Sequence, residues 1–561
     1  MIGLRAHCDG RMSGLRQDRN SFFLHWREIA NYFIPRRYKW LVTPNQATKG
    51  SPINSMILDN TPTTALRILA SGMMSGITSP TRPWFRLKIE GYSQDATSPV
   101  VLWLDEVRRR MTKVLQESNF YNCIATVYID LGSFGTAPML IYEDYDDVIR
   151  CYNPCAGEYF IGVNDKGVVD SFAREFVMSV KAVVDWFGLE ACSDSVKSDF
   201  ARGAAAWSNE IKINHLIEPN IGGIGSIPRT FAFREVYWEA GSNTSTNLAE
   251  KGFFEFPGIC PRWDITSNEA YGRSPAMDAL GDVKQLQQET RRKAQAIDKL
   301  VNPPMIADVT LKNQPASTLP GGITYISGLN NSAHAGMRPM YQFQPPIQEL
   351  REDIIAIQQR IGRTMYNDLF MMISQLDTVR TATEIDARRE EVLIQLGPTL
   401  ERFNTEGLDR ALERVFGIML RGGLLPPPPP EIASAEIQIE YVSMLAEAQN
   451  AVASTAIERL LALGGHLAAI EPDIMDNIDL DETMNQYANM LNVPPQVMRS
   501  RDDLTTLRQE KMQRQQMAEA GATAAAGAEA AKNLAAVPVG GGQNAVEAML
   551  SGGGLPANAP I

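Results

Sequence analysis

The residues best suited to chemistry in this chain are its cysteines and histidines, and they are few. Cys151 and Cys155 stand in the sequence CYNPC, a spacing that could supply two thiolate ligands to a metal ion. No second cysteine pair follows them, and His215 is remote from them in the sequence. We therefore interpret both as ordinary loop or core cysteines, and we expect neither a metal site nor a disulfide framework.

Two further segments could be mistaken for reactive sites. The acidic run EDYDD at 143–147 offers oxygen ligands for a divalent cation, but it also fits a solvated turn, which we favour. The glycine-rich GGIGSIP at 222–228 lacks the lysine and the following helix of a phosphate-binding loop. With no catalytic motif and only five histidines, the chain is predicted not to be an enzyme and to need no cofactor.

The composition indicates a folded protein that does not coat nucleic acid. A length of 561 residues suits roughly three or four domains, and 44% hydrophobic with 21% charged residues is ordinary for a folded chain. The net charge of −12 argues against a surface that grips phosphates, although an acidic wall with a few basic positions lets DNA slide past. No run is apolar enough to span a membrane and no secretory signal is visible, so we expect a cytoplasmic protein without a membrane partner.

The first 270 residues combine helix and strand patterns. Phe22, Trp26, Ile29 and Phe33 form the stripe of an amphipathic helix, and further helices are predicted at 59–75 and 99–118. Strands are predicted at 84–89, 139–144, 158–165, 168–178, 209–217, 231–238 and 251–256. We therefore expect an α+β region with a mostly antiparallel sheet over 1–270.

Long helical patterns dominate after residue 270. Ser274 as N-cap and Pro275 in the first turn begin a helix that ends before a Pro-Pro pair. Short strands linked by Gly, Asn and Pro fill 305–345, and a second helix is predicted at 346–369. Two helices of similar length that flank a compact β module imply a stalk with a small head at its far end.

The last third of the chain is predicted to be mainly helical. A helix of up to forty residues begins at 381 and should kink at Gly397–Pro398, and five prolines at 426–430 form a stiff spacer before a strand at 436–441. The pattern beyond 442 is helical. From about 515 the composition collapses to Ala, Gly, Glu and Gln; a poorly ordered tail is expected there, with a helix over 503–533 as the alternative.

This order of segments and four short motifs resemble the head-to-tail connecting proteins, or portal proteins, of podoviruses, the short-tailed double-stranded DNA bacteriophages. The motifs are WFRLKI at 84–89, NEAYGRSPAMDALGDVKQL at 268–286, RTATEIDARREE at 380–391 and LTTLRQEKMQRQQ at 504–516. YGRSP by itself fits an ordinary turn and N-cap. Its spacing from TATEI, about a hundred residues later, makes the pairing specific.

The resemblance implies an α+β multidomain portal fold. In that fold 1–270 form an antiparallel-sheet wing, 271–302 and 347–369 an α-helical stem, and 303–346 a small β-rich clip. Residues 370–380 form a tunnel loop and 381–425 a long kinked wing helix. A return strand and an α-helical crown follow over 426–515, and 516–561 form a low-complexity C-terminal tail.

The resemblance also implies a function and partners. Twelve subunits would form a homo-oligomeric ring at one capsid vertex of the virion, between head and tail, after assembly in the host cytoplasm. The ring would be the conduit for genome packaging and ejection and would dock terminase and then tail adaptor or nozzle proteins, beside major capsid and scaffolding proteins. Double-stranded DNA would pass without sequence-specific contacts. Another ring-forming head-completion or minor capsid protein is the alternative, although such proteins are usually shorter.

Two groups of residues are the candidate sites. The tunnel loop must project inward, because it joins a stem helix along the channel to a helix that runs outward. Its channel-facing residues are expected to be Met371, Met372, Ser374, Gln375, Thr378 and Arg380. The alternative is that both methionines pack as core. The second group is a basic cluster in the first stem helix, Arg291, Arg292 and Lys293, which faces the channel or a neighbouring subunit unless it is simply a solvated helix face.

Overall fold

The computed structural model describes most of the first 432 residues and parts of the remainder. The described residues are 3–40, 56–89, 99–220, 224–241, 247–267, 269–301, 305–306, 338–339, 346–374, 396–432, 437–441, 457–467, 478–490, 499 and 501–535. The chain divides into two compact units, which are described separately. The first comprises 1–87, 107–426 and 439–452, and the second comprises 88–106, 427–438 and 453–561.

The first unit has a body in which helices pack on two antiparallel sheets. A five-stranded sheet has the order β4-β5-β6-β7-β8, and a three-stranded sheet has the order β3-β2-β9. The bounds of these strands are β2 (Met139–Asp144), β3 (Val148–Tyr152), β4 (Tyr159–Val163), β5 (Val169–Ser179), β6 (Glu210–Pro219), β7 (Phe233–Glu239), β8 (Ala249–Phe253) and β9 (Gly258–Ile259). Mixed helices and antiparallel strands were predicted for this region, and the structure confirms them.

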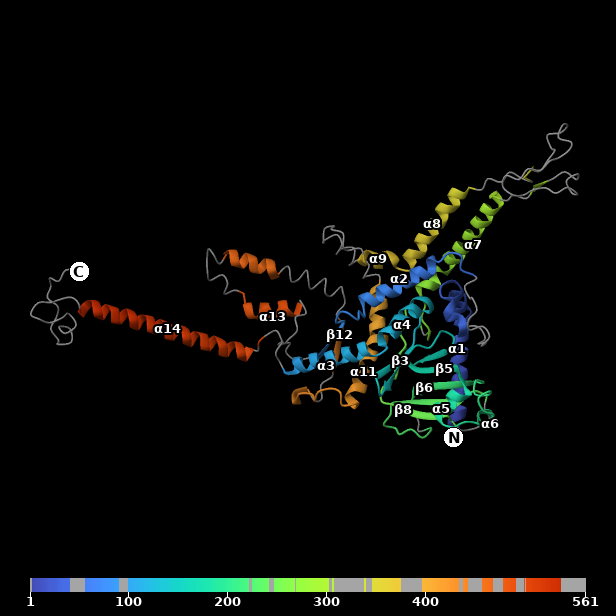
Figure 1. The fold of residues 1–561 in the computed structure, drawn as a ribbon, viewed down its shortest axis with the longest axis horizontal. Helices are drawn as coiled ribbons and strands as arrows, with labels where there is room; N and C mark the ends of the chain where they lie inside the picture. Colours follow the sequence, from blue (N-terminus) through green and yellow to red (C-terminus); the bar gives the residue numbers. More distant parts are fainter. Residues whose placement is uncertain are drawn as a thin grey trace, which may run out of the picture. The chain divides into compact units, whose positions relative to one another are not determined.

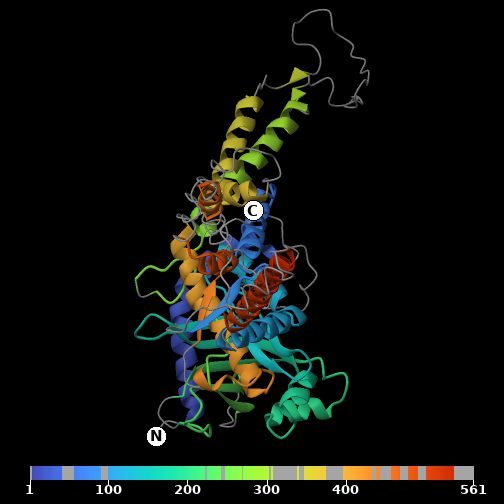
Figure 2. The same cartoon turned by 90° about the vertical axis from the view of Figure 1, so that its left-hand side faces the viewer.

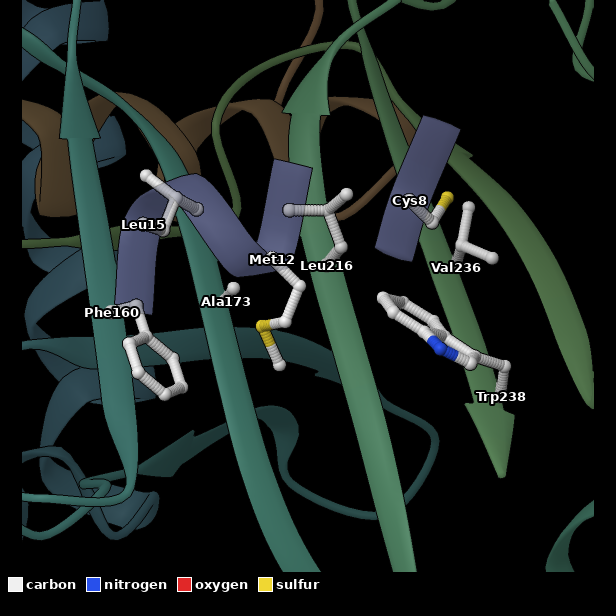
Figure 3. Close-up of a cluster of buried hydrophobic side chains, with 8 residues drawn as sticks. All are labelled: Cys8, Met12, Leu15, Phe160, Ala173, Leu216, Val236 and Trp238. Atoms are coloured by element: carbon white, nitrogen blue, oxygen red, sulfur yellow. The ribbon is translucent and has the colours of Figure 1, made fainter. Parts of the chain in front are cut away.

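One face of the five-stranded sheet is covered by helix α1 (Leu4–Tyr32), which Figure 3 shows lying across the strands. Cys8, Met12 and Leu15, spaced by about one helical turn, point from α1 into the sheet. These side chains pack on a row of buried residues that are paired across strands β4 to β7: Phe160, Ala173, Leu216 and Val236. Trp238, two residues after Val236 on β7, belongs to the same cluster. Further along α1, the predicted stripe is buried at Trp26 and Ile29.

The opposite face of this sheet carries a buried polar layer. The adjacent row Arg174, His215 and Tyr237 points away from α1, because successive residues of a strand face opposite sides. The Arg174 Nε donates to His215 Nδ1 at 3.0 Å, so His215 is protonated at Nε2, which donates to Glu235 Oε1 at 2.8 Å. From the three-stranded sheet, Tyr142 donates to the same carboxylate at 3.1 Å. The two sheets therefore meet through hydrogen bonds as well as apolar packing.

A helical hairpin projects from this body (Figures 1 and 2). It consists of α7 (Pro275–Val301) and α8 (Ile347–Thr364), and the strands β10 (Met305–Ile306) and β11 (Arg338–Pro339) pair antiparallel beyond its tip. The remaining residues of the expected clip, 307–337 and 340–345, lie outside the described residues. The predicted start of α7 at Ser274 and Pro275 is confirmed.

The other helices of the first unit support the hairpin and the sheets. They are η1 (Pro35–Trp40), α2 (Thr61–Gly76), α4 (Phe120–Phe134), α5 (Val180–Phe187), α6 (Asp194–Ala201), α9 (Asn367–Ser374) and α11 (Asp409–Arg421). The helix α4 and the strand β3 had not been predicted, nor had α5 and α6. Most of α4 is buried, including Phe120, Ile124, Val127 and Leu131, so it lacks the polar stripe by which a surface helix is detected.

Two expected boundaries differ from the structure. The second hairpin helix was predicted to continue to 369, but α8 ends at Thr364 because Tyr366 has a positive φ of 56°. A separate helix, α9, then covers 367–374, so the first residues of the expected tunnel loop are helical. The kink predicted at Gly397–Pro398 involves undescribed residues before 396. In the described part of that helix the irregularity is a π-helical turn, η4 (Asn404–Leu408), ahead of α11.

The second unit contains helices at 457–467, α13 (Leu480–Met490) and α14 (Arg501–Ala535). Tyr487 of α13 donates to Glu458 Oε1 at 2.6 Å, and Arg508 of α14 forms two hydrogen bonds of 2.7 Å with Asp481. The helical pattern predicted beyond 442 is thus present. The poorly ordered tail predicted from about 515 is wrong for 516–535, where the helical alternative is found; 536–561 lie outside the described residues. Three further elements are divided between the two units, because a boundary between the units falls inside each of them. They are α3 (Pro99–Glu117), β1 (Phe85–Ile89) and β12 (Ile437–Tyr441).

Candidate functional site

The base of the α7–α8 hairpin is built from the YGRSP motif. Ser274 caps α7, because its Oγ accepts from the amide of Met277 at 3.2 Å, and the same hydroxyl donates to the carbonyl of Ser133 in α4 at 2.7 Å. Pro275 follows in the first turn, where its missing N–H costs no hydrogen bond. One serine therefore both starts α7 and attaches it to α4.

Two glycines allow the chain to cross at this point. A Cβ added to Gly272 would overlap the carbonyl oxygen of Gly135, and a Cβ on Gly135 would overlap that of Gly272. Gly135 also ends α4 with φ of +74°, a conformation that side chains with a Cβ disfavour. The Gly272 amide donates to Thr136 Oγ1 at 2.8 Å. The glycine of YGRSP is therefore required by a backbone crossing.

Tyr271 fixes the same segment to the body. Its side chain is fully buried, its hydroxyl accepts from the amide of Ile161 at 3.0 Å, and its ring packs 5.2 Å from the rings of Trp26 and Phe22. Burial raises the pKa of Tyr271. The motif thus contacts α1 and β4 through Tyr271 and α4 through Ser274, and the direction of α7 relative to the body is set by these contacts.

A buried ion pair joins this junction to the π-helical turn. Arg262, which is 2% exposed, donates through Nη2 to Glu406 Oε1 at 2.6 Å and through Nε and its amide to Oε2, both at 3.1 Å. The extra residue of a π turn rotates the following helix, and such turns are often found at functional positions. Here the π turn contains Glu406, and α11 begins directly after it at Asp409.

A second polar clamp holds the hairpin to the start of α2. Gln287 of α7 is 5% exposed; its Oε1 accepts from the amides of Leu58 and Asp59 at 2.7 and 2.9 Å, and its Nε2 donates to the Asp59 carbonyl at 2.9 Å. Gln358 of α8 donates to Asp59 Oδ2 at 2.8 Å. The Asp59 Oδ1 accepts from the amide of Thr61 at 2.8 Å and so provides an acceptor for the first amide of α2. The sequence predicted that this helix begins near residue 59, but it did not predict the contacts of Asp59 with both hairpin helices.

The expected tunnel-loop residues are placed only in part. Met371 lies in α9 and is 44% exposed, whereas Phe370 packs so closely on Gly72 of α2 that a Cβ there would overlap its ring. Met371 is therefore partly exposed in the single chain, and its place in the channel stays a prediction. Met372 and Ser374 belong to the same helix, but their side chains are not described, and Gln375, Thr378 and Arg380 lie outside the described residues.

The expected basic cluster lies on the far half of α7. Arg291 and Arg292 are exposed and Lys293 is half-buried. Among the described residues, none of the three forms a hydrogen bond or an ion pair with α9.

The segments that could have been reactive are structural. Asp144 Oδ1 accepts from the amides of Asp146 and Asp147 at 2.9 and 3.1 Å, which confirms the turn at 143–147. Burial raises the pKa of Cys151, and all six cysteines are free thiols. In the glycine-rich 222–228, the amide and hydroxyl of Ser226 are both engaged by Glu250. Across the described residues no group of three or more His, Cys, Asp or Glu could hold a metal ion.

Within the described ranges, no helix combines the length and apolar character of a bilayer-crossing segment.

Comparison with known proteins defines the class. Residues 5–498 match the family model described as bacteriophage head to tail connecting protein. The chain is 39% identical over 531 residues to the probable portal protein of Bordetella phage BPP-1, covering 94% of each chain. It is 38% identical over 530 residues to the portal protein of Salmonella phage epsilon15, covering 93% of this chain and 94% of that one.

Solved structures of phage-like particles are also similar. The neck of an empty GTA particle, computed with C6 symmetry, gives a TM-score of 0.32 at 10% identity and covers 72% of this chain and 86% of that chain. The virion of a native gene transfer agent gives a TM-score of 0.28 at 12% identity, with 71% and 95% covered.

The sequence matches identify a structural protein of the phage head and tail rather than an enzyme. The chain belongs to the family of bacteriophage head-to-tail connecting proteins.

Proposed function

We propose that this chain is the portal subunit of a short-tailed phage, twelve copies of which form a ring at one capsid vertex of the virion, between head and tail. The observation that carries the proposal is the similarity to two portal proteins over 94% of their lengths. The ring is assembled in the host cytoplasm and serves as the conduit for packaging and ejection of the genome.

The junction at the base of the hairpin supports this function mechanically. A conduit must keep its wall in place while DNA is driven through it, so the hairpin needs fixed attachment to the body. Ser274, Gly272, Tyr271 and Gln287 provide this attachment through buried contacts with α1, α2, α4 and β4. In this scheme the body is the wing, α7 and α8 are the stem, 303–346 is the clip, and the helices after 442 form the crown.

The tunnel loop is proposed to begin at the end of α9. The contact of Phe370 with Gly72 anchors α9 to α2, while Met371 on the same helix remains exposed. A flexible apolar side chain can slide along a phosphate surface without holding it. Residues 375–380, with Gln375, Thr378 and Arg380, supply weak contacts that do not depend on base sequence.

The partners follow from the position of the ring. The clip docks terminase while the head is filled and then tail adaptor or nozzle proteins, and the wing and crown meet the major capsid and scaffolding proteins. Terminase supplies the ATP hydrolysis. The alternative, another ring-forming head-completion protein, has no requirement for a loop that touches moving DNA.

A length-matched replacement tests the conduit. Replacing 375–380 by a Gly-Ser segment should leave rings intact and reduce DNA retained in packaged heads at least tenfold. Met371→Leu, which keeps an apolar side chain, serves as the control and should package normally. Normal packaging with the Gly-Ser segment, or loss of the ring itself, would count against the placement of the loop.

A further inference from the structure

The far half of the hairpin leaves apolar side chains in contact with solvent. Ile297, Leu300 and Val301 of α7 are 40%, 47% and 78% exposed, and Ile355 of α8 is 41% exposed. Ile354, Ile357 and Ile361 are buried, so Ile355 lies outside the contact that α8 makes with its own chain. Exposed apolar residues concentrated in one projecting element are typical of an interaction surface.

The two helices carry opposite charge over the same part of the hairpin. Residues 288–301 of α7 contain four basic and two acidic residues, and residues 347–356 of α8 contain three acidic residues and one basic residue. The two ends lie side by side because the helices are antiparallel and joined at the tip by β10 and β11 (Figure 1). One copy therefore presents a basic helix beside an acidic helix.

The residues that the structure describes do not neutralise these charges. Among the described residues, Arg291, Arg292 and Lys293 form no ion pair, and neither do Glu349, Glu352 and Asp353. Nearer the body the hairpin does form such pairs, since Asp282 of α7 bonds Arg360 of α8 at 3.1 Å. The segment that exposes apolar residues therefore also carries unpaired charges of both signs.

The position of Arg291 on α7 indicates which side is basic. Lys284 bonds Glu28 of α1 at 2.8 Å, whereas Asp282 faces α8. Arg291 follows Lys284 by seven residues, which is close to two helical turns, so it continues the flank of α7 that is turned away from α8. A partner that approaches this flank meets Arg291 before it meets α8.

We propose that α7 of one copy packs against α8 of the next copy, with Arg291 and Arg292 opposite Glu349, Glu352 and Asp353. Lys293 follows Asp282 by eleven residues, close to three helical turns, so it lies on the side of α7 that faces its own α8. Contact between two α7 helices, or between two α8 helices, would place like charges together. The favourable contact is therefore head-to-tail, and a head-to-tail contact closes into a ring if its rotation permits. This inference rests on the proposed ring and assigns Arg291 and Arg292 of the basic cluster to the subunit contact rather than to the channel.

Charge reversal in the full-length protein tests the contact. The variants are the triple R291E/R292E/K293E, the triple E349K/E352K/D353K, and the two combined. The control K166E/R229E/K251E makes the same charge change as the triple R291E/R292E/K293E, at exposed positions of the body. Ring content is measured by native mass spectrometry over a range of protein concentrations, and circular dichroism verifies that each variant is folded.

We expect each hairpin triple to raise the concentration needed for half-maximal ring formation at least tenfold at low salt. The combined variant should return to within about threefold of the parent, because reversing both helices restores complementarity. The control should assemble like the parent. High salt should narrow these differences, since it screens exposed charges.

Other results would overturn the proposal in distinguishable ways. If both triples form rings normally while the basic-cluster triple alone retains less DNA, the cluster faces the channel and only the contact is wrong. If both triples fail and their combination does not recover, the charges are not paired with each other. If the parent protein never forms rings, the proposed function itself fails.

Discussion

Gln287 of α7 forms two hydrogen bonds with the backbone of Asp59: its Oε1 accepts from the Asp59 amide and its Nε2 donates to the Asp59 carbonyl, both at 2.9 Å. The two residues are separated by 228 positions in the chain. The contact joins the hairpin to the helix that supports α9, so it links the proposed stem to the base of the proposed tunnel loop.

Substitution of Gln287 should weaken this link. Gln287→Ala leaves the amides of Leu58 and Asp59 without their acceptor, and we expect the free energy of unfolding to fall by about 1–3 kcal/mol. Urea denaturation gives the value. Gln288→Ala, at the exposed neighbouring position, should change it by less than about 0.5 kcal/mol. Equal effects of the two substitutions would show that the clamp is not important.

The glycine crossing at the hairpin base should not tolerate a methyl group. Gly272→Ala would place a Cβ on the carbonyl oxygen of Gly135, a backbone atom that cannot move aside alone. We expect a loss of more than about 3 kcal/mol or failure to fold. Gly281→Ala, in α7 with open space around it, should instead stabilise by about 0.5–1 kcal/mol. Thermal unfolding of the two variants gives opposite shifts if the crossing is as described.

Removal of Glu406 should destabilise the junction through Arg262. Glu406→Ala leaves a guanidinium that is 2% exposed without its carboxylate, and we expect a cost of about 3 kcal/mol. Glu401→Ala, one turn earlier and exposed, is the control. A cost below about 1 kcal/mol for Glu406→Ala would mean that Arg262 finds water or another acceptor.

Acid should weaken the body through His215. Burial lowers the pKa of His215 to about 4, although its hydrogen bond to Glu235 opposes the shift. The unfolded chain takes up a proton near pH 6.5 and the folded chain only near pH 4, so the free energy of unfolding falls as the pH is lowered through this window. The contribution of His215 is at most about 3 kcal/mol.

The variant His215→Gln isolates this contribution. It removes the titrating group, so its unfolding free energy should depend less steeply on pH between 6.5 and 4 than that of the parent. His466→Gln, at an exposed position, should follow the parent. Parallel pH curves for the parent and His215→Gln would show that His215 does not remain neutral in the folded protein.

The features that the sequence predicted correctly are those determined by residues close together in the chain, such as the start of a helix or its buried side. Ser274 and Pro275 mark the start of α7 by composition alone, and the spacing of Trp26 and Ile29 predicted the buried side of α1. The π turn and the pairing of Arg262 with Glu406 carry no local signal, because the partners are 144 positions apart. Helix α4 was missed because burial on several sides hides its periodicity, and Tyr366 gave no sign that α8 would end, since tyrosine rarely adopts positive φ.

Imaging of the purified full-length protein tests the portal assignment most directly. Negative-stain micrographs should show an annulus with a central hole, and native mass spectrometry should give about twelve times the mass of the 561-residue chain. A monodisperse monomer at micromolar concentration, or a closed particle without a central hole, would contradict the assignment.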